Sequence, residues 1–554
     1  MAPSSAPPGT RIGTSPAPGR RDRSLLATRR FSAGSLIATF SNPLLALPDG
    51  PSMRTTCNYC LRVGGSSSLR ACTACKAAVY CDATCQRAHW KTGVHKAECK
   101  MFARIRSTTG KDWLPTPVRA VAQVLLLLKT QDPAMITAFV DRQKGLEGNV
   151  DEFRKNAQDV WADYELQAMA AVVYAGLLQS KEVLNTAKEV LCRIQTNAFN
   201  RLDADTGTAG IFLDAVLAMI NHSCVPNAFV GFDRRTAMLR AERNIEIGEE
   251  IEISYVDYTI PKAARQETLK LYHFQCACPR CRDNLDVYQV CKTLSTIALN
   301  RFSLQPNLSK LRDPPIDRSR ISNSEVEMIY NKWHSLQATA DYTKDALKIA
   351  SLRWKLCKPL VDASMWAVEP LPSSILELAS LCQTDDAKFA YALPLACLLA
   401  TECEPVKLVA PFLPWRVKGV MMIAKLLGRI GELTATGEFA EVCPHKGLVK
   451  ILSRSDQVSM CEAMLRLVVH YASMGASEDW DVLKEARELL QDIESLKGRE
   501  KESYFLRTWA KDPQDPEGCE FFEVAVLKPV NELAALAVEI MDAELGDKQS
   551  LVRR

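Results

Sequence analysis

The spacing of apolar residues divides the chain into a region of short strands, a helical insert and a long helical C-terminal part. Short apolar runs on either side of the turn signal Ser32-Ala33-Gly34 predict a hairpin between residues 23–28 and 33–37. Ile251 and Ile253 alternate after a Gly-Glu-Glu turn, which predicts a half-buried strand ending at Tyr255. Apolar residues at helical spacing predict helices over residues 118–129, 151–167 and 181–194.

The two ends of the chain have different patterns. From about residue 284 onward, long amphipathic stretches predict helices, among them 324–336, 417–427, 458–472 and 481–496. Pro and Gly separate these stretches, which favours paired helices, although no strict 34-residue period is present. Residues 1–20 are rich in Pro, Ser, Gly, Ala and Arg, cannot bury much apolar surface, and are expected to be disordered.

Composition narrows the class of protein. A chain of 554 residues is too long for a single core, so several domains are expected. Its hydrophobic content of 47% and charged content of 24% are ordinary for a globular protein, and the net charge of +4 gives no general case for nucleic-acid binding. The longest apolar run, Val121–Leu128, is too short to span a bilayer, so we expect a buried helix and no membrane partner.

Twenty cysteines are many for this length, and eight metal-type ligands fall within residues 57–99. The chain is long and shows no signal peptide, so closely spaced Cys and His residues indicate metal sites rather than a secreted disulfide framework. The ligands come in short pairs, each able to present two ligands to one tetrahedral Zn²⁺: Cys57 and Cys60, Cys72 and Cys75, Cys81 and Cys85, His95 and Cys99. His89 falls outside this spacing and is expected on the surface. Lys and Arg are in excess here; a solvated face is the first interpretation, with DNA or an acidic partner as the alternative.

A second motif is Asn221-His222-Ser223-Cys224, which follows a mostly apolar run. By itself it is weak, because an Asn-His pair can satisfy a tight turn and Cys224 can be a small buried hydrophobe. Cys276, Cys278 and Cys281 follow within sixty residues and are one ligand short of a tetrahedral zinc site. Cys224 is the expected fourth ligand.

Asn221-His222-Ser223-Cys224, Tyr255 and the following Cys-x-Cys-x2-Cys together resemble the core of SET-domain protein lysine methyltransferases. The inserted Cys/His cluster, with Trp90 before His95, resembles a MYND finger and narrows the resemblance to the SET-and-MYND (SMYD) family over residues 21–283. The implied fold is α+β and multidomain, with a SET-type β-rich core. The implied domains are a disordered tail (1–20), the N-terminal part of the SET domain (21–56), the MYND finger (57–99), a helical SET insert (100–195), the SET core (196–258), a post-SET zinc segment (259–283) and a helical tetratricopeptide-like domain (284–554).

The resemblance also implies roles for single residues. Cys57, Cys60, Cys81 and Cys85 would hold one zinc ion, and the remaining four finger ligands a second. Tyr255 would orient the substrate amine, and Phe199 and Tyr272 would form walls of the lysine channel. S-adenosylmethionine would be bound by Arg23, Ser24, Asn149, Asn197, Asn221, His222, Tyr255 and Phe274. The chain departs from the family pattern at Asp22-Arg23-Ser24, where Gly-x-Gly is common, at Asp214-Ala215, where Tyr-Pro is frequent, and at Ala218, where Ser often lines the channel.

The expected function is S-adenosylmethionine-dependent methyl transfer to the side-chain amine of lysine in a histone or another protein, with three structural zinc ions. The resemblance implies a monomer in nucleus and cytoplasm, with proline-rich peptides as further partners of the finger. The alternative is an inactive SET-MYND scaffold that binds proline-rich partner peptides in transcriptional regulation. The departures at residues 22–24 and 218 favour the scaffold, whereas Asn221, His222, Tyr255, Tyr272 and Phe274 favour the enzyme.

Overall fold

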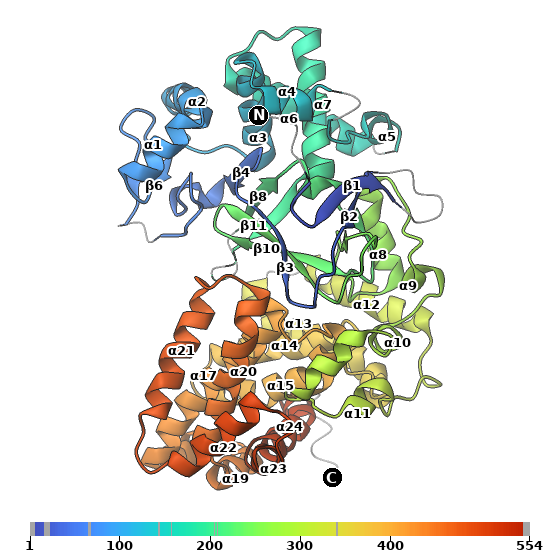
Figure 1. Cartoon of the computed structure of the whole chain (residues 1–554), viewed down its shortest axis with the longest axis vertical. Coiled ribbons are helices and arrows are strands. Elements are labelled where there is room, and N and C mark those ends of the chain that lie inside the picture. Colours follow the sequence, from blue (N-terminus) through green and yellow to red (C-terminus); the bar gives the residue numbers. More distant parts are fainter. Residues whose placement is uncertain are drawn as a thin grey trace. The chain divides into compact units, whose positions relative to one another are not determined.

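The computed structural model describes residues 6–546, except for 16–22, 65–67, 142–144, 157, 204, 206, 208 and 339–341. The chain folds as two compact units (Figure 1). The first comprises Met1–Ala241, Ile245–Ile253 and Leu269–Gln275, and the second comprises Glu242–Asn244, Ser254–Thr268 and Cys276–Arg554.

The first unit contains the described strands, which form five small sheets. Four of the sheets are antiparallel. Two have two strands each: β1 (Thr10–Thr14) with β2 (Arg23–Ala27), and β5 (Arg70–Ala71) with β6 (Val79–Tyr80). Two have three strands each, in the order β10 (Ala228–Asp233), β11 (Thr236–Ala241), β3 (Leu36–Phe40) and in the order β4 (Leu45–Pro48), β8 (Ala209–Leu213), β7 (Phe199–Leu202). The short strands β9 (Asn221–His222) and β12 (Glu252–Ile253) pair in parallel, which brings the Asn-His motif beside the predicted strand.

Two expectations about the N-terminus are wrong. Thr10–Thr14 form β1 and pair with β2, so this part of the expected disordered tail is ordered; residues 1–5 and 16–20 lie outside the described residues. The expected hairpin between residues 23–28 and 33–37 does not form, because β2 takes β1 as its partner and β3 pairs with β11. The Ser32-Ala33-Gly34 turn, with Gly34 at φ 80°, therefore directs the chain to a different sheet.

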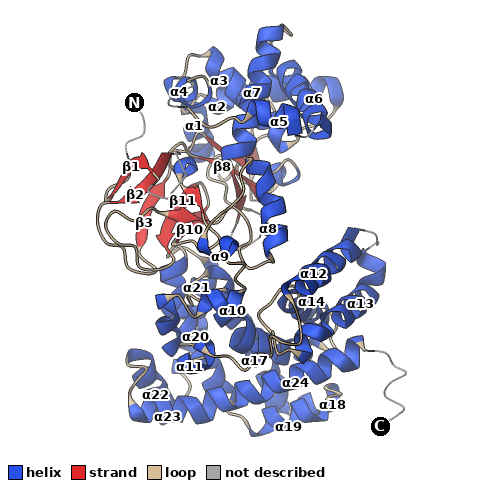
Figure 2. Ribbon diagram, turned by 90° about the vertical axis from the view of Figure 1, so that its right-hand side faces the viewer, coloured by secondary structure: helices blue, strands red, loops and turns tan. Residues whose placement is uncertain are grey.

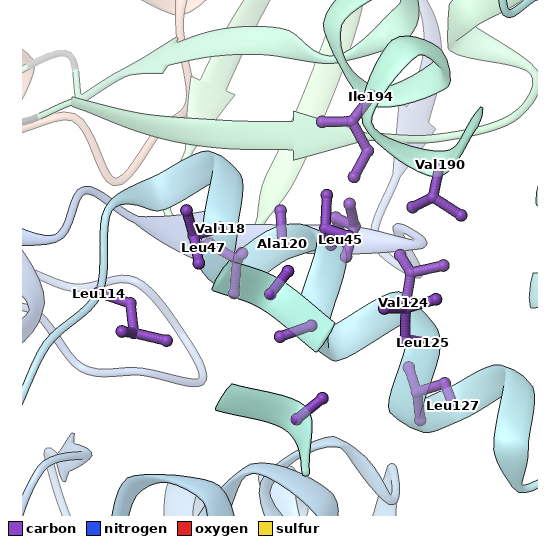
Figure 3. Close-up of a cluster of buried hydrophobic side chains, with 14 of the residues drawn as sticks. Leu45, Leu47, Leu114, Val118, Ala120, Val124, Leu125, Leu127, Val190 and Ile194 are labelled. Atoms are coloured by element: carbon purple, nitrogen blue, oxygen red, sulfur yellow. The ribbon is translucent and has the colours of Figure 1, made fainter. Parts of the chain in front are cut away.

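The first unit also contains α-helices. They are α1 (Ala83–Lys91), α2 (Val94–Thr109), α3 (Thr116–Lys129), α4 (Pro133–Phe139), α5 (Val150–Asn156), α6 (Gln158–Ala175) and α7 (Lys181–Asn197). The long apolar run lies in α3, where Val121 and Val124 are fully buried. Figure 3 shows side chains of α3 clustered with Leu45 and Leu47 of β4 and with Val190 and Ile194 of α7. This core joins the helical insert to the strand region, as an apolar helix face must do.

The regular secondary structure described in the second unit is helical, with loops between the helices (Figure 2). Its α-helices are α8 (Lys262–Leu269), α9 (Pro279–Arg282), α10 (Val287–Cys291), α11 (Leu308–Arg312), α12 (Asn323–Ala338), α13 (Tyr342–Asp362), α14 (Leu371–Gln383), α15 (Ala392–Leu398), α16 (Glu404–Lys407), α17 (Pro414–Thr436), α18 (Phe439–Val442), α19 (Lys446–Arg454), α20 (Gln457–Gly475), α21 (Asp481–Glu494), α22 (Glu500–Lys511), α23 (Pro516–Phe522) and α24 (Lys528–Leu545). The four stretches predicted from amphipathic spacing lie in α12, α17, α20 and α21, so the helical prediction is confirmed.

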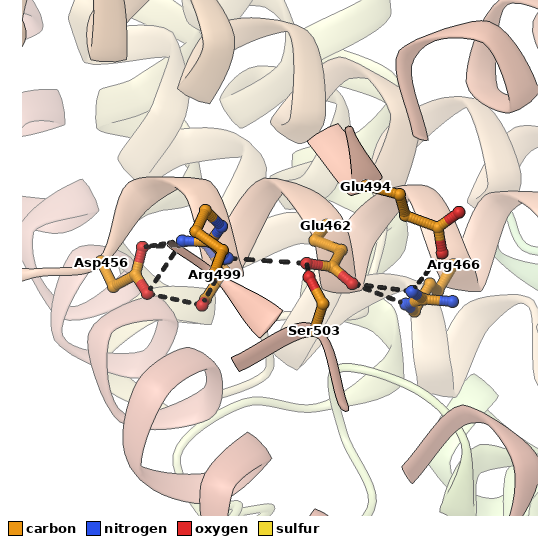
Figure 4. Close-up of polar contacts among 7 residues, drawn as sticks. Asp456, Glu462, Arg466, Glu494, Arg499 and Ser503 are labelled. Atoms are coloured by element: carbon orange, nitrogen blue, oxygen red, sulfur yellow. Dashed lines mark hydrogen bonds and ion pairs between the residues drawn. The ribbon is translucent and has the colours of Figure 1, made fainter. Parts of the chain in front are cut away.

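The interior of the helical unit is largely apolar but contains several buried ion pairs, one of them at Glu462. The stretch Phe389–Lys407 is long and apolar enough to cross a membrane, but 89% of its apolar window is buried inside the protein, as a core helix would be. On α20, Glu462 is fully buried and accepts from Arg466 (Nη2 to Oε1, 2.7 Å) and from the Ser503 hydroxyl (2.8 Å) (Figure 4). These contacts tie α22 to α20.

Candidate cofactor and zinc sites

The finger gathers its eight predicted ligands into two clusters. One comprises Cys57, Cys60, Cys81 and Cys85, the other Cys72, Cys75, His95 and Cys99, and within each the ligand atoms lie within 4.8 Å of one another. Local structure explains this placement. Asp82 caps α1 and accepts from the Cys85 backbone N–H at 2.9 Å, which fixes the backbone of this ligand in the first turn of the helix. His95 and Cys99 lie one turn apart on α2 and therefore face the same way.

The close packing of sulfur atoms in these clusters indicates that each cluster binds a cation. Desolvation, followed by the charge of neighbouring cysteines, raises the pKa of Cys85 and Cys99 to about 12. A hydrogen bond from Cys60 lowers the pKa of Cys57 to about 5. Several thiolates cannot share so small a space without a metal ion, and four Cys or His ligands are the set that Zn²⁺ takes in structural sites. The residues therefore fit zinc.

His89 corrects the sequence interpretation. It is 3% exposed rather than on the surface, its Nδ1 lies 3.1 Å from the Tyr80 hydroxyl, and its ring stacks on His95 at 5.5 Å. Burial lowers its pKa well below 6.5, so the ring is neutral. Its position one helical turn after Cys85 on α1 was the signal for this, because residues four apart share one helix face.

The third cluster comprises Cys224, Cys276, Cys278 and Cys281. All four are buried, and their sulfur atoms lie within 4.8 Å of one another. Helix α8 supports this cluster through Gln266, which exchanges two hydrogen bonds with the Cys276 backbone (3.0 and 2.8 Å), and Arg265, which lies 3.6 Å from the Cys281 sulfur. Three clusters of four ligands fit three zinc ions.

Several predicted cofactor residues meet at the loop that precedes α5. Arg23 donates through Nη2 to the Gly145 carbonyl at 2.6 Å and lies 3.7 Å from the Glu147 carboxylate. Asn197 donates to the Glu147 carbonyl at 2.7 Å. Asn149 has φ 47°, a left-handed conformation that Asn tolerates. Its carbonyl accepts a hydrogen bond from the Phe153 backbone N–H in the first turn of α5. The start of β2, the end of α7 and this loop are thus tied together by side chains.

Asn221 is held from two sides. Its Nδ2 donates to the Arg23 carbonyl at 3.2 Å and to the Glu250 carboxylate at 2.7 Å. Glu250 is 6% exposed and also accepts from the Ser15 hydroxyl at 2.5 Å. Glu250 was missed at the sequence level, where Gly248-Glu249-Glu250 was interpreted only as a turn. The carboxylate orients the Asn221 amide so that its oxygen is left for another donor.

Two of the predicted cofactor residues in the first unit carry aromatic rings. His222 is buried, its Nε2 lies 3.3 Å from the Cys224 sulfur, and its ring lies 5.9 Å from that of half-buried Phe274. His273, at φ 58°, packs edge-on against Phe153 of α5 with ring centroids 4.3 Å apart. The segment around Phe274 is thereby fixed against α5 and the Asn-His motif.

The predicted channel residues come from three different segments of the chain. Phe199 begins β7, and its ring centroid lies 6.5 Å from that of Phe232. Tyr272 ends a 3-10 turn, Lys270–Tyr272, and Tyr255 lies two residues after β12. All three side chains are half-buried. Desolvation raises the pKa of Tyr272, so its hydroxyl keeps its proton.

Two of the departures from the family pattern have structural consequences. Ser24 is fully buried, and its hydroxyl has no hydrogen-bond partner among the described residues. Asp214 accepts from the backbone N–H groups of Val216 (2.9 Å) and Leu217 (3.1 Å) and so caps the turn Leu217–Met219, while desolvation raises its pKa. Asp22 lies outside the described residues.

Comparison with known proteins agrees with this geometry. The family model for the SET domain matches residues 22–256. The chain is 32% identical over 291 residues to SET domain and MYND-type zinc finger protein 6 of Schizosaccharomyces pombe, a match that covers 52% of this chain and 56% of the relative. The chain is thus similar to SET-domain proteins over residues 22–256 and to a SET-and-MYND protein over about half its length.

Two further relatives to which the chain is similar carry enzyme names. Histone-lysine N-methyltransferase ASHR1 of Arabidopsis thaliana is 30% identical over 49% of the chain and 55% of the relative. N-lysine methyltransferase SMYD2-B of Danio rerio is 30% identical over 50% of the chain and 60% of the relative. The chain thus matches little more than half the length of these relatives.

Proposed function

We propose that the protein is an S-adenosylmethionine-dependent protein lysine N-methyltransferase with three structural zinc ions. The observation that supports the proposal is that Arg23, Asn149, Asn197, Asn221, His222 and Phe274 all lie in the unit that contains most of the SET-family match. The relatives named as lysine methyltransferases support the same reaction class.

The residues fit this cofactor because they leave suitable groups free. Within the described part of the chain, no group donates to the Asn221 amide oxygen, and the Asn149 side chain makes no hydrogen bond. These two carboxamides can bind the polar groups of the cofactor, and the half-buried Phe274 ring can stack on its adenine. When bound, the cofactor would supply an electrophilic methyl group.

The protein's own residues would act mainly by position. The attacking lysine must be neutral and in line with the methyl group, and correct placement accounts for a large part of such rates. The Tyr255 hydroxyl would accept from or donate to the amine and so orient it. Phe199 and Tyr272 would form a narrow aromatic wall that attracts the lysine head before it loses its proton. Solvent can remove that proton, so no carboxylate is needed as a base.

The substrate would be a histone or another protein with an accessible lysine. We also propose a monomer acting in nucleus and cytoplasm. Exposed cations on the finger, such as Arg87, Lys91 and Lys96, suit an acidic or nucleic-acid partner, whereas the family resemblance favours proline-rich peptides.

A calorimetric titration of the zinc-loaded full chain with S-adenosylmethionine tests the proposal. We expect 1:1 binding that Asn221→Ala weakens, because it removes the oriented amide. Asn331→Ala, on the exposed surface of α12, is the matched control and should bind like the parent. Folded, zinc-loaded parent protein that binds no cofactor would move the assignment to the scaffold function.

A further inference from the structure

The buried carboxylate of Glu250 is a charged group beside the candidate cofactor site to which the proposed reaction gives no role. Its side chain accepts two hydrogen bonds, one from the Asn221 amide (2.7 Å) and one from the Ser15 hydroxyl (2.5 Å). Glu250 is 6% exposed and Ser15 is also buried, so little water reaches these contacts. Two neutral donors are thus the partners of a full negative charge.

This carboxylate makes no ion pair with any described residue. Arg23 is close, because its carbonyl accepts from the Asn221 amide at 3.2 Å. Its guanidinium, however, is directed to the Gly145 carbonyl (2.6 Å) and the Glu147 carboxylate (3.7 Å). A buried carboxylate without a cation is unfavourable, because hydrogen bonds from neutral groups offset only part of the lost hydration. The electrostatics at Glu250 therefore favour a positively charged ligand.

Asn221 links this charge to the candidate cofactor site. Its Nδ2 donates to both Glu250 and the Arg23 carbonyl, which fixes the amide and leaves its oxygen for another donor. The parallel pairing of β9 with β12 places Asn221 opposite Glu252, two residues after Glu250. A cofactor bound by the Asn221 oxygen would therefore lie one side chain away from a buried negative charge.

We propose that Glu250 makes the site selective for the charge of its ligand, so that S-adenosylmethionine is bound in preference to the product S-adenosylhomocysteine. This inference rests on the proposed function. The two compounds differ by one methyl group and by the charge on sulfur, because sulfur keeps the electron pair of the broken S–C bond and becomes a neutral thioether. The attraction between Glu250 and the sulfonium is thus present before methyl transfer and absent afterwards, which favours release of the product.

Calorimetric titration of the zinc-loaded full chain with each compound tests the proposal. Glu250→Gln removes the charge but can keep both contacts, since the new amide oxygen accepts from Asn221 and the amide nitrogen donates to the Ser15 hydroxyl. We expect the preference for S-adenosylmethionine, measured as the ratio of the two dissociation constants, to fall about tenfold, as one unpaired charge in partly buried surroundings can produce. A loss of positioning alone would weaken both compounds equally and leave the ratio unchanged.

Two variants serve as controls. Glu249→Gln removes the carboxylate of the adjacent residue, which is half-buried and accepts from the Asn227 amide (3.1 Å), so the ratio should stay as in the parent. Ser15→Ala removes one hydrogen bond to Glu250 but keeps the charge, so the two affinities should change together. Melting temperature and zinc content, compared with those of the parent, verify that each variant is folded.

The outcomes separate this inference from the proposed function. An unchanged ratio in folded Glu250→Gln, or an equal change in Glu249→Gln, overturns the inference while cofactor binding by the parent still supports a methyltransferase. The parent alone provides a second test, because tighter binding of S-adenosylhomocysteine than of S-adenosylmethionine would contradict the inference whether or not the variant folds. A folded parent that binds neither compound overturns both.

Discussion

The ion pair between Glu98 and Arg119 joins the finger to the rest of the first unit, and its contribution can be tested. Arg119 of α3 donates through Nε and Nη2 to the two carboxylate oxygens of Glu98 on α2, at 2.9 and 3.0 Å. The side chains are 1% and 0% exposed. Glu98 lies between the zinc ligands His95 and Cys99 on the same helix. Arg119→Met keeps the apolar stem and removes the charge.

The expected cost is large because the partner stays buried. Leaving one member of a buried pair uncompensated typically costs about 3–5 kcal/mol. The pair between Arg54 and Asp112 joins similar parts of the chain, but its side chains are 48% and 28% exposed, and pairs of that kind contribute about 0–1 kcal/mol. Arg54→Met is therefore the matched control, with an expected loss several times smaller.

Hydrogen exchange resolved by mass spectrometry measures the effect locally, which a chain of two units requires. Peptides of α2 in Arg119→Met should lose about 3 kcal/mol of opening free energy, while peptides of α20 should not change. The double variant with Glu98→Met should recover most of the loss, since no buried charge then remains. A loss in Arg119→Met no larger than in Arg54→Met would refute the reasoning.

Three further outcomes are expected. Elemental analysis should find three zinc ions per chain, and a stoichiometry of two would break the assignment of Cys224 to the third cluster. Tyr255→Phe should lower the single-turnover methylation rate by about 10²–10³ with unchanged cofactor affinity, and Tyr272→Phe should lower it less; equal turnover of Tyr255→Phe and parent would exclude the assigned role. Burial raises the pKa of Glu242 from 4.5 to about 7, so its protonated form stabilises the fold below pH 4.5 and this contribution is lost as the pH rises through 7. Urea unfolding from pH 4.5 to 8 should therefore show the parent losing up to about 3 kcal/mol relative to Glu242→Gln, and parallel pH profiles would contradict this.

The zinc clusters and the long helices were predictable because local spacing determines them. Cys57 and Cys60 stand close together in any turn of that length, and the same holds for Cys278 and Cys281, so only the association of the pairs depends on the fold. The helix over α20 follows from apolar residues three and four apart.

Strand partners were less predictable. Residues 23–28 had a plausible partner downstream in residues 33–37, but β2 pairs with β1 on its N-terminal side. The composition of residues 1–20 concealed β1, because Thr10–Thr14 form a strand between two proline-containing stretches. His89 was misplaced for a different reason: ligand spacing was used where helix periodicity decides exposure.

The supports of the candidate cofactor site could not be predicted locally because they join residues far apart in sequence. Glu250 fixes Asn221, and Arg23 reaches a carbonyl more than a hundred residues away at Gly145. These contacts bear on the strongest objection to an active enzyme, the loss of glycine at residues 22–24. The Ser24 side chain is fully buried, so it does not occupy surface where a ligand would lie, and the Arg23 guanidinium is engaged with the loop before α5. Ser24, the described residue at a family glycine position, is thus buried in the protein, and this favours the methyltransferase over the scaffold.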